Sequence, residues 1–381
     1  MTQHTLTAAL VAGTMLATGS LATAQTLTVL TAGDQNMVDY VNEYLAPMFE
    51  AEHPGVTVRA LGTGPGDAGS QMIYERLAAQ AAAGSATVDV DVAVVHQKMA
   101  GQMVAEDLLD AYRDKIATGD LVTRDTARMA LGTDVEGYVM PMFHSQTALA
   151  YNPALVESPP ATFDDLVAWV EANPGQFGYN GIKGGMSGVA FVMGWMYAFT
   201  DQPEQLMNGP FDEAVTAEWD GALASLKDFN QHVVFTPGNA GTLDALNRGE
   251  IAMGPVWVDM FYTWQADGRL NPDLKLQLIG PGMPGQPMYY VQPRGAEHAE
   301  LAASFIELAT SPAVQAEGIV ERFNWYPGID AEHVQAELDD ETWQRLFADI
   351  GPADLAEKGR SFPIGPYFDE ILEAYERQVT N

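Results

Sequence analysis

The sequence predicts an α/β protein in which parallel strands alternate with helices. Between residues 26 and 95, apolar runs of strand length alternate with segments of helical periodicity. A second α/β stretch continues to about residue 254, and a chain of 381 residues is long enough for two domains. Cysteine is absent, so the fold depends on its apolar cores, and thiol catalysis and thiolate metal ligands are excluded.

The first elements have clear start and stop signals. Residues 26–31 (TLTVLT) form the first predicted strand, and apolar side chains then recur at helical spacing from residue 37 to 49. His53-Pro54-Gly55 ends that helix, and residues 56–61 form the second strand. These three elements predict the start of a parallel sheet.

A glycine-rich loop, residues 62–69, leads into a predicted helix that ends at Gly84, and residues 88–95 form the third strand. Ligands of parallel α/β sheets bind beyond the carboxyl ends of the strands. The positions expected there are Asp34, Gly64 and His96 with the adjoining Gln97.

The ends and the charge of the chain limit its location and partners. Residues 6–22 are apolar and followed by Ala22-Thr23-Ala24, which predicts a secretory signal peptide (residues 1–24) cleaved after Ala24. No later apolar stretch approaches the 18 or more residues of a membrane span. The net charge of −33 opposes binding to nucleic acid or anionic lipid, so we expect neither as a partner.

The later elements follow from similar patterns. Residues 137–151 predict two short extended runs, and Thr162 predicts the cap of a helix that starts at Phe163. A helix over residues 300–317 is expected to break at Ser311-Pro312, and the tail over residues 339–379 is expected to be mostly helical.

Several segments, in order along residues 25–325, resemble the extracellular solute-binding proteins of ABC importers, in the large sugar-binding-type family of maltose-binding-type proteins. The segments are FEAEHPGVTV, EGYVMPMFHSQTALAYN, PPATFDDL, RGEIAMGPVW and AASFIELATSPAVQ. The stretch NPGQFGYNGIKGGMSG is unlike the maltose type and is similar to a less characterised branch, so the resemblance does not identify the ligand.

The resemblance implies a two-lobed periplasmic binding protein fold of the type II kind, with a mixed, mainly parallel sheet in each lobe and a ligand cleft between the lobes. It places residues 25–148 and 284–318 in one lobe, and residues 149–283 and 319–381 in the other. The implied function is to capture a small solute and deliver it to a membrane permease. We expect a monomer without a lipid anchor, since there is no cysteine at the cleavage site.

The loop contains Gly64-Pro65-Gly66-Asp67-Ala68-Gly69, a G-x-G-x-x-G sequence that is typical of dinucleotide-binding turns. Here it follows the second strand rather than the first, and Pro65 stiffens a turn whose amides would have to face a pyrophosphate. We therefore expect no cofactor. Either the glycines shape the rim of the cleft and let the backbone approach a ligand, or the loop is simply exposed.

Aromatic and acidic residues near position 257 are the first site candidates. Trp257, Phe261 and Trp264 have the spacing of a buried helix face. The family resemblance implies that Trp257 instead faces the cleft and stacks on the ligand, with Asp259 as a polar neighbour.

Other candidates come from loops and crossovers, and each has a structural alternative. Gly185, Met186 and Ser187 present helix N-terminal amides to a ligand oxygen, or Ser187 is an ordinary cap. His144, Ser145 and Gln146 bind ligand or pack the hinge. The remaining candidates are Asp34, Gln35 and Asn36, which either bind hydroxyls or cap a helix, and the loop aromatics Tyr289, Tyr290, Trp325 and Tyr326, with Tyr179 and Asn180 of the same type.

The favoured hypothesis is a binding protein, not an enzyme, for a hydroxyl-rich solute such as a sugar, oligosaccharide or polyol. The alternative keeps the fold but places an anionic or amino-acid-like solute on the amides of residues 184–188, with Lys183 or Arg322. A secreted carbohydrate-active enzyme is a third possibility, because two opposed carboxylates could occur in so acidic a chain. No histidine pair has metal-binding spacing, so no metal is expected.

Overall fold

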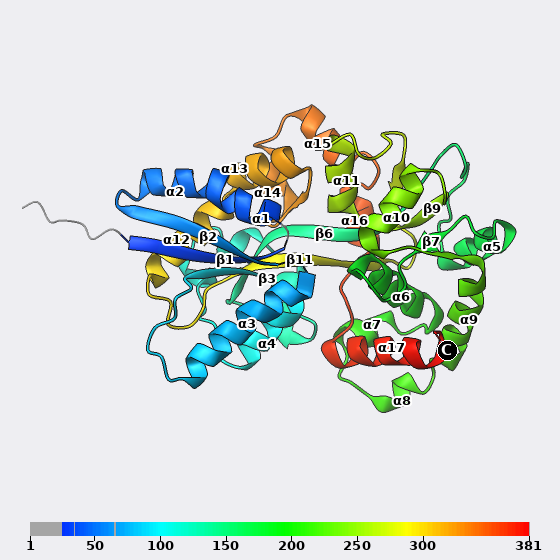
Figure 1. Cartoon of the computed structure of the whole chain (residues 1–381), viewed down its shortest axis with the longest axis horizontal. Helices are drawn as coiled ribbons and strands as arrows, with labels where there is room; N and C mark the ends of the chain where they lie inside the picture. Colours follow the sequence, from blue (N-terminus) through cyan, green and yellow to red (C-terminus); the bar gives the residue numbers. More distant parts are fainter. Residues whose placement is uncertain (1–24, 34, 65, 381) are drawn as a thin grey trace, which may run out of the picture.

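The computed structural model describes residues 25–33, 35–64 and 66–380, and Figure 1 shows two halves joined by strands that run through both. Residues 1–24, which contain the predicted export signal, lie outside the described residues, as does the candidate Asp34. Within the described ranges, no helix has the length and apolar character needed to cross a membrane.

The first half is built on three parallel strands. β1 (Gln25–Ala32) lies between β2 (Val56–Gly64) and β3 (Val92–His96). The predicted third strand therefore begins later than residue 88. Just before it, Asp91 donates its backbone N–H to the Thr28 carbonyl, and the Asp91 carboxylate accepts the backbone N–H groups of Thr28 and His298.

Helices cover both faces of these strands. On one side, α1 (Gln35–Asp39), a π-helical turn (Tyr40–Leu45) and α2 (Ala46–Glu52) follow one another without a break, and on the other side lie α3 (Gly66–Ala82) and α4 (Gln97–Ala105) (Figure 1). The predicted order of strand, helix, strand, helix and strand is confirmed.

Two long strands connect the halves. β6 (Val139–Tyr151) pairs antiparallel with β11 (Met283–Val291) over its first part, and with β9 (Met253–Trp257) and β10 (Lys275–Gln277) over its second part. The prediction of two short runs over residues 137–151 is wrong. Polar side chains in the middle of the segment do not form a turn, because they alternate between the two faces of one continuous strand.

The second half packs around α6 (Met186–Phe199), whose Phe191 and Trp195 are fully buried. α5 (Phe163–Ala172) begins as expected, because the Thr162 hydroxyl accepts the Asp165 N–H at 3.1 Å. Three further helices in this half are α9 (Asp220–Phe229), α10 (Gly238–Asn247) and α11 (Val258–Ala266).

The remaining elements complete both halves. The expected break at Ser311-Pro312 occurs, and the tail contains three separate helices. In chain order these elements are β4 (Met129–Ala130), β5 (Thr133–Asp134), β7 (Gly178–Tyr179), α7 (Pro203–Asn208), α8 (Glu213–Thr216), β8 (Val234–Phe235), α12 (Ala299–Ala309), α13 (Pro312–Val314), a π-helical segment (Gln315–Glu321), β12 (Tyr326–Pro327), α14 (Ala331–Gln335), α15 (Asp340–Leu346), α16 (Pro352–Lys358), β13 (Gly359–Arg360) and α17 (Gly365–Gln378).

The sheet is mixed, as predicted, and its strand order is β10-β6-β11-β3-β1-β2. Its parallel part, β3-β1-β2, lies in the first half, and the crossing strands pair antiparallel with β3, β9 and β10. Two apolar cores flank the crossing strands: one surrounds β1 to β3 and extends to α11, and the other surrounds α6. The protein therefore has two α/β lobes on one continuous sheet.

Candidate ligand-binding cleft

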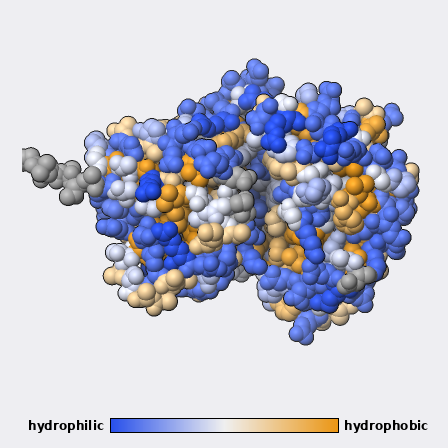
Figure 2. All heavy atoms as spheres, viewed as in Figure 1, coloured by the Kyte–Doolittle hydropathy of each residue, from blue (hydrophilic) through white to orange (hydrophobic). Residues whose placement is uncertain are grey.

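The middle of β6 separates two cavities. Successive side chains of a strand point to opposite faces, so Phe143 and Ser145 lie on one face and His144 and Gln146 on the other. Phe143 and Ser145 line a cavity of about 460 Å³, the front cleft, and His144 and Gln146 line one of about 580 Å³, the rear cavity. Figure 2 shows that the surface is hollowed between the two lobes.

The floor of the front cleft is one face of the sheet. Ser145 is in register with Gln286 of β11, and Phe143 is in register with Met288, which is itself in register with His96 of β3. Residues in register across a sheet point to the same side. All five side chains accordingly line the front cleft.

Trp257 and Asp259 form one wall. Trp257 ends β9 and is the N-cap of α11, and Asp259 lies in the first turn of that helix, where a carboxylate is favoured by the helix dipole. Ser145 donates a short hydrogen bond from Oγ to the Asp259 carboxylate. The bond ties the floor strand to the wall of the cleft, and it brings together two residues that the sequence placed near a ligand.

The Asp259 side chain is partly exposed to the cleft. Burial raises its pKa, while hydrogen bonds from Ser145 and from the backbone N–H groups of Asp259 and Met260 act in the opposite direction. Among the described residues that line the front cleft, Asp259 is the only acid and there is no Lys or Arg. A positively charged ligand group would supply the missing counter-charge.

The cleft also contains aromatic and thioether surface. Trp325 is buried, stacks on Phe323 with ring centroids 4.5 Å apart, and donates from Nε1 to the Asp259 carbonyl at 3.2 Å. Trp264, predicted to be core, is buried but also lines the cleft, and the Arg269 guanidinium lies 3.8 Å from its ring centroid. Trp257 is buried and packs in the second core, and it also lines the cleft, so a ligand can contact only the part of the indole that the core leaves uncovered.

His96 lies on the opposite side of the floor, at the end of β3. Its Nδ1 is 3.0 Å from the hydroxyl of Ser70, and the same hydroxyl accepts the His96 backbone N–H at 3.0 Å. Burial lowers the pKa of His96, with a smaller opposing effect from Asp67. The neutral imidazole is therefore oriented by Ser70 and offers Nε2 for a ligand hydrogen bond.

The start of α6 contributes Gly184, Gly185 and Met186 to the cleft. Ser187 is not the cap, as one alternative had it: Gly185 is the N-cap, and Ser187 is fully buried inside the helix. Its hydroxyl and its N–H both donate to Asn239 Oδ1, at 2.7 and 3.1 Å. A Cβ on Gly185 would lie 2.2 Å from that oxygen, so glycine is needed for Asn239 to reach the helix end.

Near the first strand, Gly33 and Asn36 line the cleft, and Asn36 Oδ1 is buried with no partner among the described atoms. Gln35 is exposed and bonds to Asp39. Gly64 lies outside the cleft, and the G-x-G-x-x-G sequence has a packing role instead. A Cβ on Gly69 would lie 1.9 Å from the Gly64 carbonyl oxygen, so glycine lets α3 start against the end of β2.

Seven other candidates lie away from the front cleft. His144, Gln146 and Tyr326 line the rear cavity instead. Tyr289 and Tyr290 are wholly buried in the first core: they belong to β11 rather than to a loop, and the Tyr289 hydroxyl bonds to Gln97 and to the Thr126 carbonyl. Tyr179 is likewise buried, and Asn180 bonds within the loop before α6.

Sequence reasoning missed part of the cleft. Gln286, Met288 and Phe143 were not predicted, because their positions depend on the pairing of β6 with β11, which sequence spacing alone does not give. Asn239 was also missed, and its signal is the helix start at Pro237-Gly238. No group of three or more potential metal ligands occurs among the described residues.

Comparison with known proteins agrees with this geometry. Residues 45–344 match the family described as "Bacterial extracellular solute-binding protein". The chain belongs to this family. It is therefore a solute-binding protein of the ABC-transporter type rather than an enzyme, while the sugar-type specificity is not confirmed. No curated protein sequence matches the chain.

Solved structures of solute-binding proteins share its two-lobed fold. One is the spermidine/putrescine ABC transporter substrate-binding protein PotD of Streptococcus pneumoniae, with a TM-score of 0.69, 14% identity and coverage of 93% of this chain and 99% of that one. Another is the Tp0655 (TpPotD) lipoprotein of Treponema pallidum, with a TM-score of 0.66, 15% identity and coverage of 94% of this chain and 100% of that one. A third is the Atu4243 GABA receptor, with a TM-score of 0.64, 19% identity and coverage of 92% of this chain and 96% of that one.

Proposed function

We propose that this solute-binding protein captures a small organic amine in the front cleft and delivers it to the permease of an ABC importer. The observation that carries the proposal is the charge of the lining. Among the described residues of the lining, Asp259 is the only acid, no Lys or Arg is present, and Trp257 contributes an indole. A carboxylate and an indole face both attract an alkylammonium group.

The uncharged part of such a ligand also has suitable surroundings. Three Trp, one Phe and four Met side chains line the cleft. Aromatic and thioether groups bind methylene chains without directional requirements. Asn36 Oδ1 is a buried acceptor that an ammonium N–H would satisfy. The compounds in the names of two structural neighbours, spermidine/putrescine and GABA, contain amino groups, which is consistent with this class.

A hydroxyl-rich solute is the second candidate. Its support is the set of polar neutral groups in the same cleft: the amides of Asn36, Asn239 and Gln286. Asn239 already accepts two hydrogen bonds from Ser187, so its oxygen is largely used. The geometry therefore favours the amine.

The anionic alternative has less support. Lys183 pairs with Glu376 at 3.7 Å and Arg322 with Glu43 at 3.6 Å, and neither lines the cleft. The N–H of Ser187 at the start of α6 is already donated to Asn239. An anion would thus meet the Asp259 carboxylate without a compensating cation.

The remaining expectations stay part of the proposal. The protein is exported to the periplasm by a signal peptide that is cleaved after Ala24, and it is a monomer. One lobe consists of residues 25–148 and 284–318, and the other consists of residues 149–283 and 319–381. We further propose that ligand contacts with both lobes favour a closed arrangement, which the permease recognises.

A thermal-shift screen followed by calorimetry tests the ligand class. Probes are putrescine, spermidine, choline, GABA, D-glucose, maltose and sulfate. We expect the amines to raise the melting temperature and Asp259→Asn to abolish that shift, since a ligand at 100 times its Kd stabilises the native state by about 2.7 kcal/mol. A shift caused by sugars and not by amines, and lost in Asp259→Asn, would support the second candidate, and stabilisation by sulfate alone would contradict both.

A further inference from the structure

The rear cavity is larger than the front cleft and shares its floor strand. It has a volume of about 580 Å³, which is ample for a small ligand. Residues from three parts of the molecule line it. Arg124 comes from the first lobe, His144 and Gln146 come from the crossing strand β6, and Arg360 comes from the second lobe. Nothing in the proposed capture of an amine uses these groups.

Gln146 provides the most specific indication of a ligand. The side chain is completely buried, and its Nε2 donates to the Thr147 carbonyl at 3.0 Å and to the Met283 carbonyl at 2.8 Å. These two acceptors fix the orientation of the amide, because a flipped amide would face both carbonyls with its oxygen. Gln146 Oε1 lies beside Gly359, which lines the cavity. No hydrogen-bond donor among the described residues reaches this oxygen. It requires a group that can donate a hydrogen bond.

Two neighbouring groups are also unsatisfied. The buried His144 Nδ1 and the buried Tyr326 hydroxyl have no hydrogen-bond partner within the described residues. Burial and the nearby Arg124 charge lower the pKa of His144 to about 3, outweighing the opposing effect of Gln146, so the imidazole is neutral at physiological pH. Both groups favour a neutral ligand with donors and acceptors.

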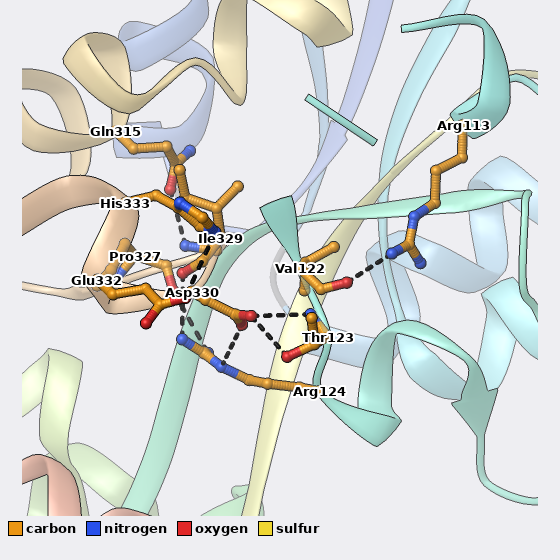
Figure 3. A network of polar contacts seen from close by, with 11 residues as sticks. Arg113, Val122, Thr123, Arg124, Gln315, Pro327, Ile329, Asp330, Glu332 and His333 are labelled. Atoms are coloured by element: carbon orange, nitrogen blue, oxygen red, sulfur yellow. Dashed lines mark hydrogen bonds and ion pairs between the residues drawn. The ribbon is translucent and has the colours of Figure 1, made fainter. Parts of the chain in front are cut away.

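The charges in the cavity are mostly neutralised within the protein. Figure 3 shows Arg124 pointing toward the Asp330 carboxylate, with Nε 3.6 Å from it, and its terminal nitrogens bonding to the Pro327 and Ile329 carbonyls. Asp330 also accepts two bonds from Thr123. Arg360 donates from Nε to the Pro281 carbonyl at 2.8 Å, and its Nη1 lies 4.0 Å from the Glu204 carboxylate, which leaves Nη2 for a ligand acceptor.

We propose that the rear cavity is a second binding site, for a small uncharged polyol or monosaccharide. An anion cannot donate to Gln146 Oε1, and the described lining carries two Arg and three acidic residues (Asp125, Asp330 and Glu332), so it has no large excess of either charge to favour an ionic ligand. A hydroxyl group donates to Gln146 and accepts from a guanidinium at once. Because the lining comes from both lobes, such a ligand also stabilises the arrangement of the lobes seen here.

The test measures binding of glycerol, D-glucose and myo-inositol by saturation-transfer NMR and calorimetry. The blocking variant is Ala356→Trp, because Ala356 lines the cavity from an exposed position on α16 and a large side chain there fills it without disturbing a core. The matched control is Ala353→Trp, at an exposed position of the same helix outside the lining. A second variant, Gln146→Met, removes the unsatisfied oxygen.

We expect at least one of the three polyols to bind the unaltered protein and the Ala353→Trp and Asp259→Asn variants with similar affinity. Affinity should fall at least tenfold in Ala356→Trp and in Gln146→Met. The proposal is overturned if none of the three binds the folded protein, which would mean that water fills the cavity. It is equally overturned if polyol binding survives in Ala356→Trp but is lost in Asp259→Asn, since the front cleft would then be the site.

Discussion

The two faces of β6 differ sharply over four consecutive residues. On the front face, Ser145 bonds to a carboxylate that has no cation near it in the described cleft, and three indoles surround it. On the rear face, His144 is neutral, Gln146 has an unsatisfied oxygen, and two guanidinium groups and three carboxyl groups line the cavity. The contrast shows that one strand can provide the floors of two cavities whose polar groups differ, which a net charge of −33 does not reveal.

The largest effect is expected on the front face, from Asp259→Asn. Removing the only acid of the described lining should weaken amine binding about 100-fold, because charge-assisted hydrogen bonds contribute about 1.5–3 kcal/mol and the cation loses its counter-charge. Calorimetry with the best amine of the screen measures this change. Polyol binding at the rear should be unchanged.

Asp267→Asn is the matched control, because it removes the same charge from the C-terminal end of α11, outside the cleft. It should leave amine affinity within about twofold. Equal losses of amine affinity in the two variants would mean that only the overall negative charge of the protein attracts the ligand. If Asp259→Asn binds the amine as tightly as the unaltered protein does, the basis for an amine site is removed.

The next effect concerns Trp257. Trp257→Ala should cost about 2 kcal/mol of amine affinity, or about 30-fold in Kd, and Trp257→Phe should recover part of it because the aromatic face is restored. Trp169→Ala in α5 serves as a control for loss of an indole elsewhere. An unchanged Kd in Trp257→Ala would assign this indole to core packing.

The sequence could predict those features of the fold and of the front cleft that depend on local signals. His96 follows a predicted strand, Trp257 and Asp259 come from the family resemblance, and all three line the front cleft. The strand-end rule works for His96 because parallel strands bring their carboxyl ends to one edge of the sheet, whereas Gly64, chosen by the same rule, lies outside the cleft. Local patterns also predicted the parallel strands and the Thr162 cap.

What sequence could not supply is the register of the crossing strands. Treating His144, Ser145 and Gln146 as one polar group hides the fact that adjacent residues of a strand face opposite ways. The same limit applies to Tyr289 and Tyr290, which look like loop aromatics beside Pro287 but lie inside β11. Separating the faces requires knowing that residues 139–151 form one strand paired over its whole length.

Acid should affect the two faces differently. The amine binds the ionised form of Asp259, whose pKa is raised by burial, so amine affinity should fall as the pH drops through that pKa. Any protonation of His96, the other titratable group of the described cleft lining, acts in the same direction. Calorimetry between pH 7.5 and pH 4 is expected to show this loss in the unaltered protein, a weaker one in Asp259→Asn, and constant polyol affinity. Amine affinity that is flat in the unaltered protein would contradict the role of Asp259.

The smallest effect is expected on the rear face, in the stability of the fold. The pKa of His144 is about 3 in the folded protein and about 6.5 when unfolded, so the unfolded chain binds more protons between these values. Stability should therefore fall as the pH drops below about 6.5, and His144→Asn should lessen that fall by an amount of the order of 1 kcal/mol at pH 5. Denaturant unfolding of both proteins between pH 8 and pH 5 measures the difference. Plotted against pH, the unfolding free energies of the two proteins should run parallel above pH 7, where the histidine is neutral in both the folded and the unfolded state. Curves that also run parallel below pH 6 would contradict the prediction, and would mean that water reaches the ring and hydrates its charged form.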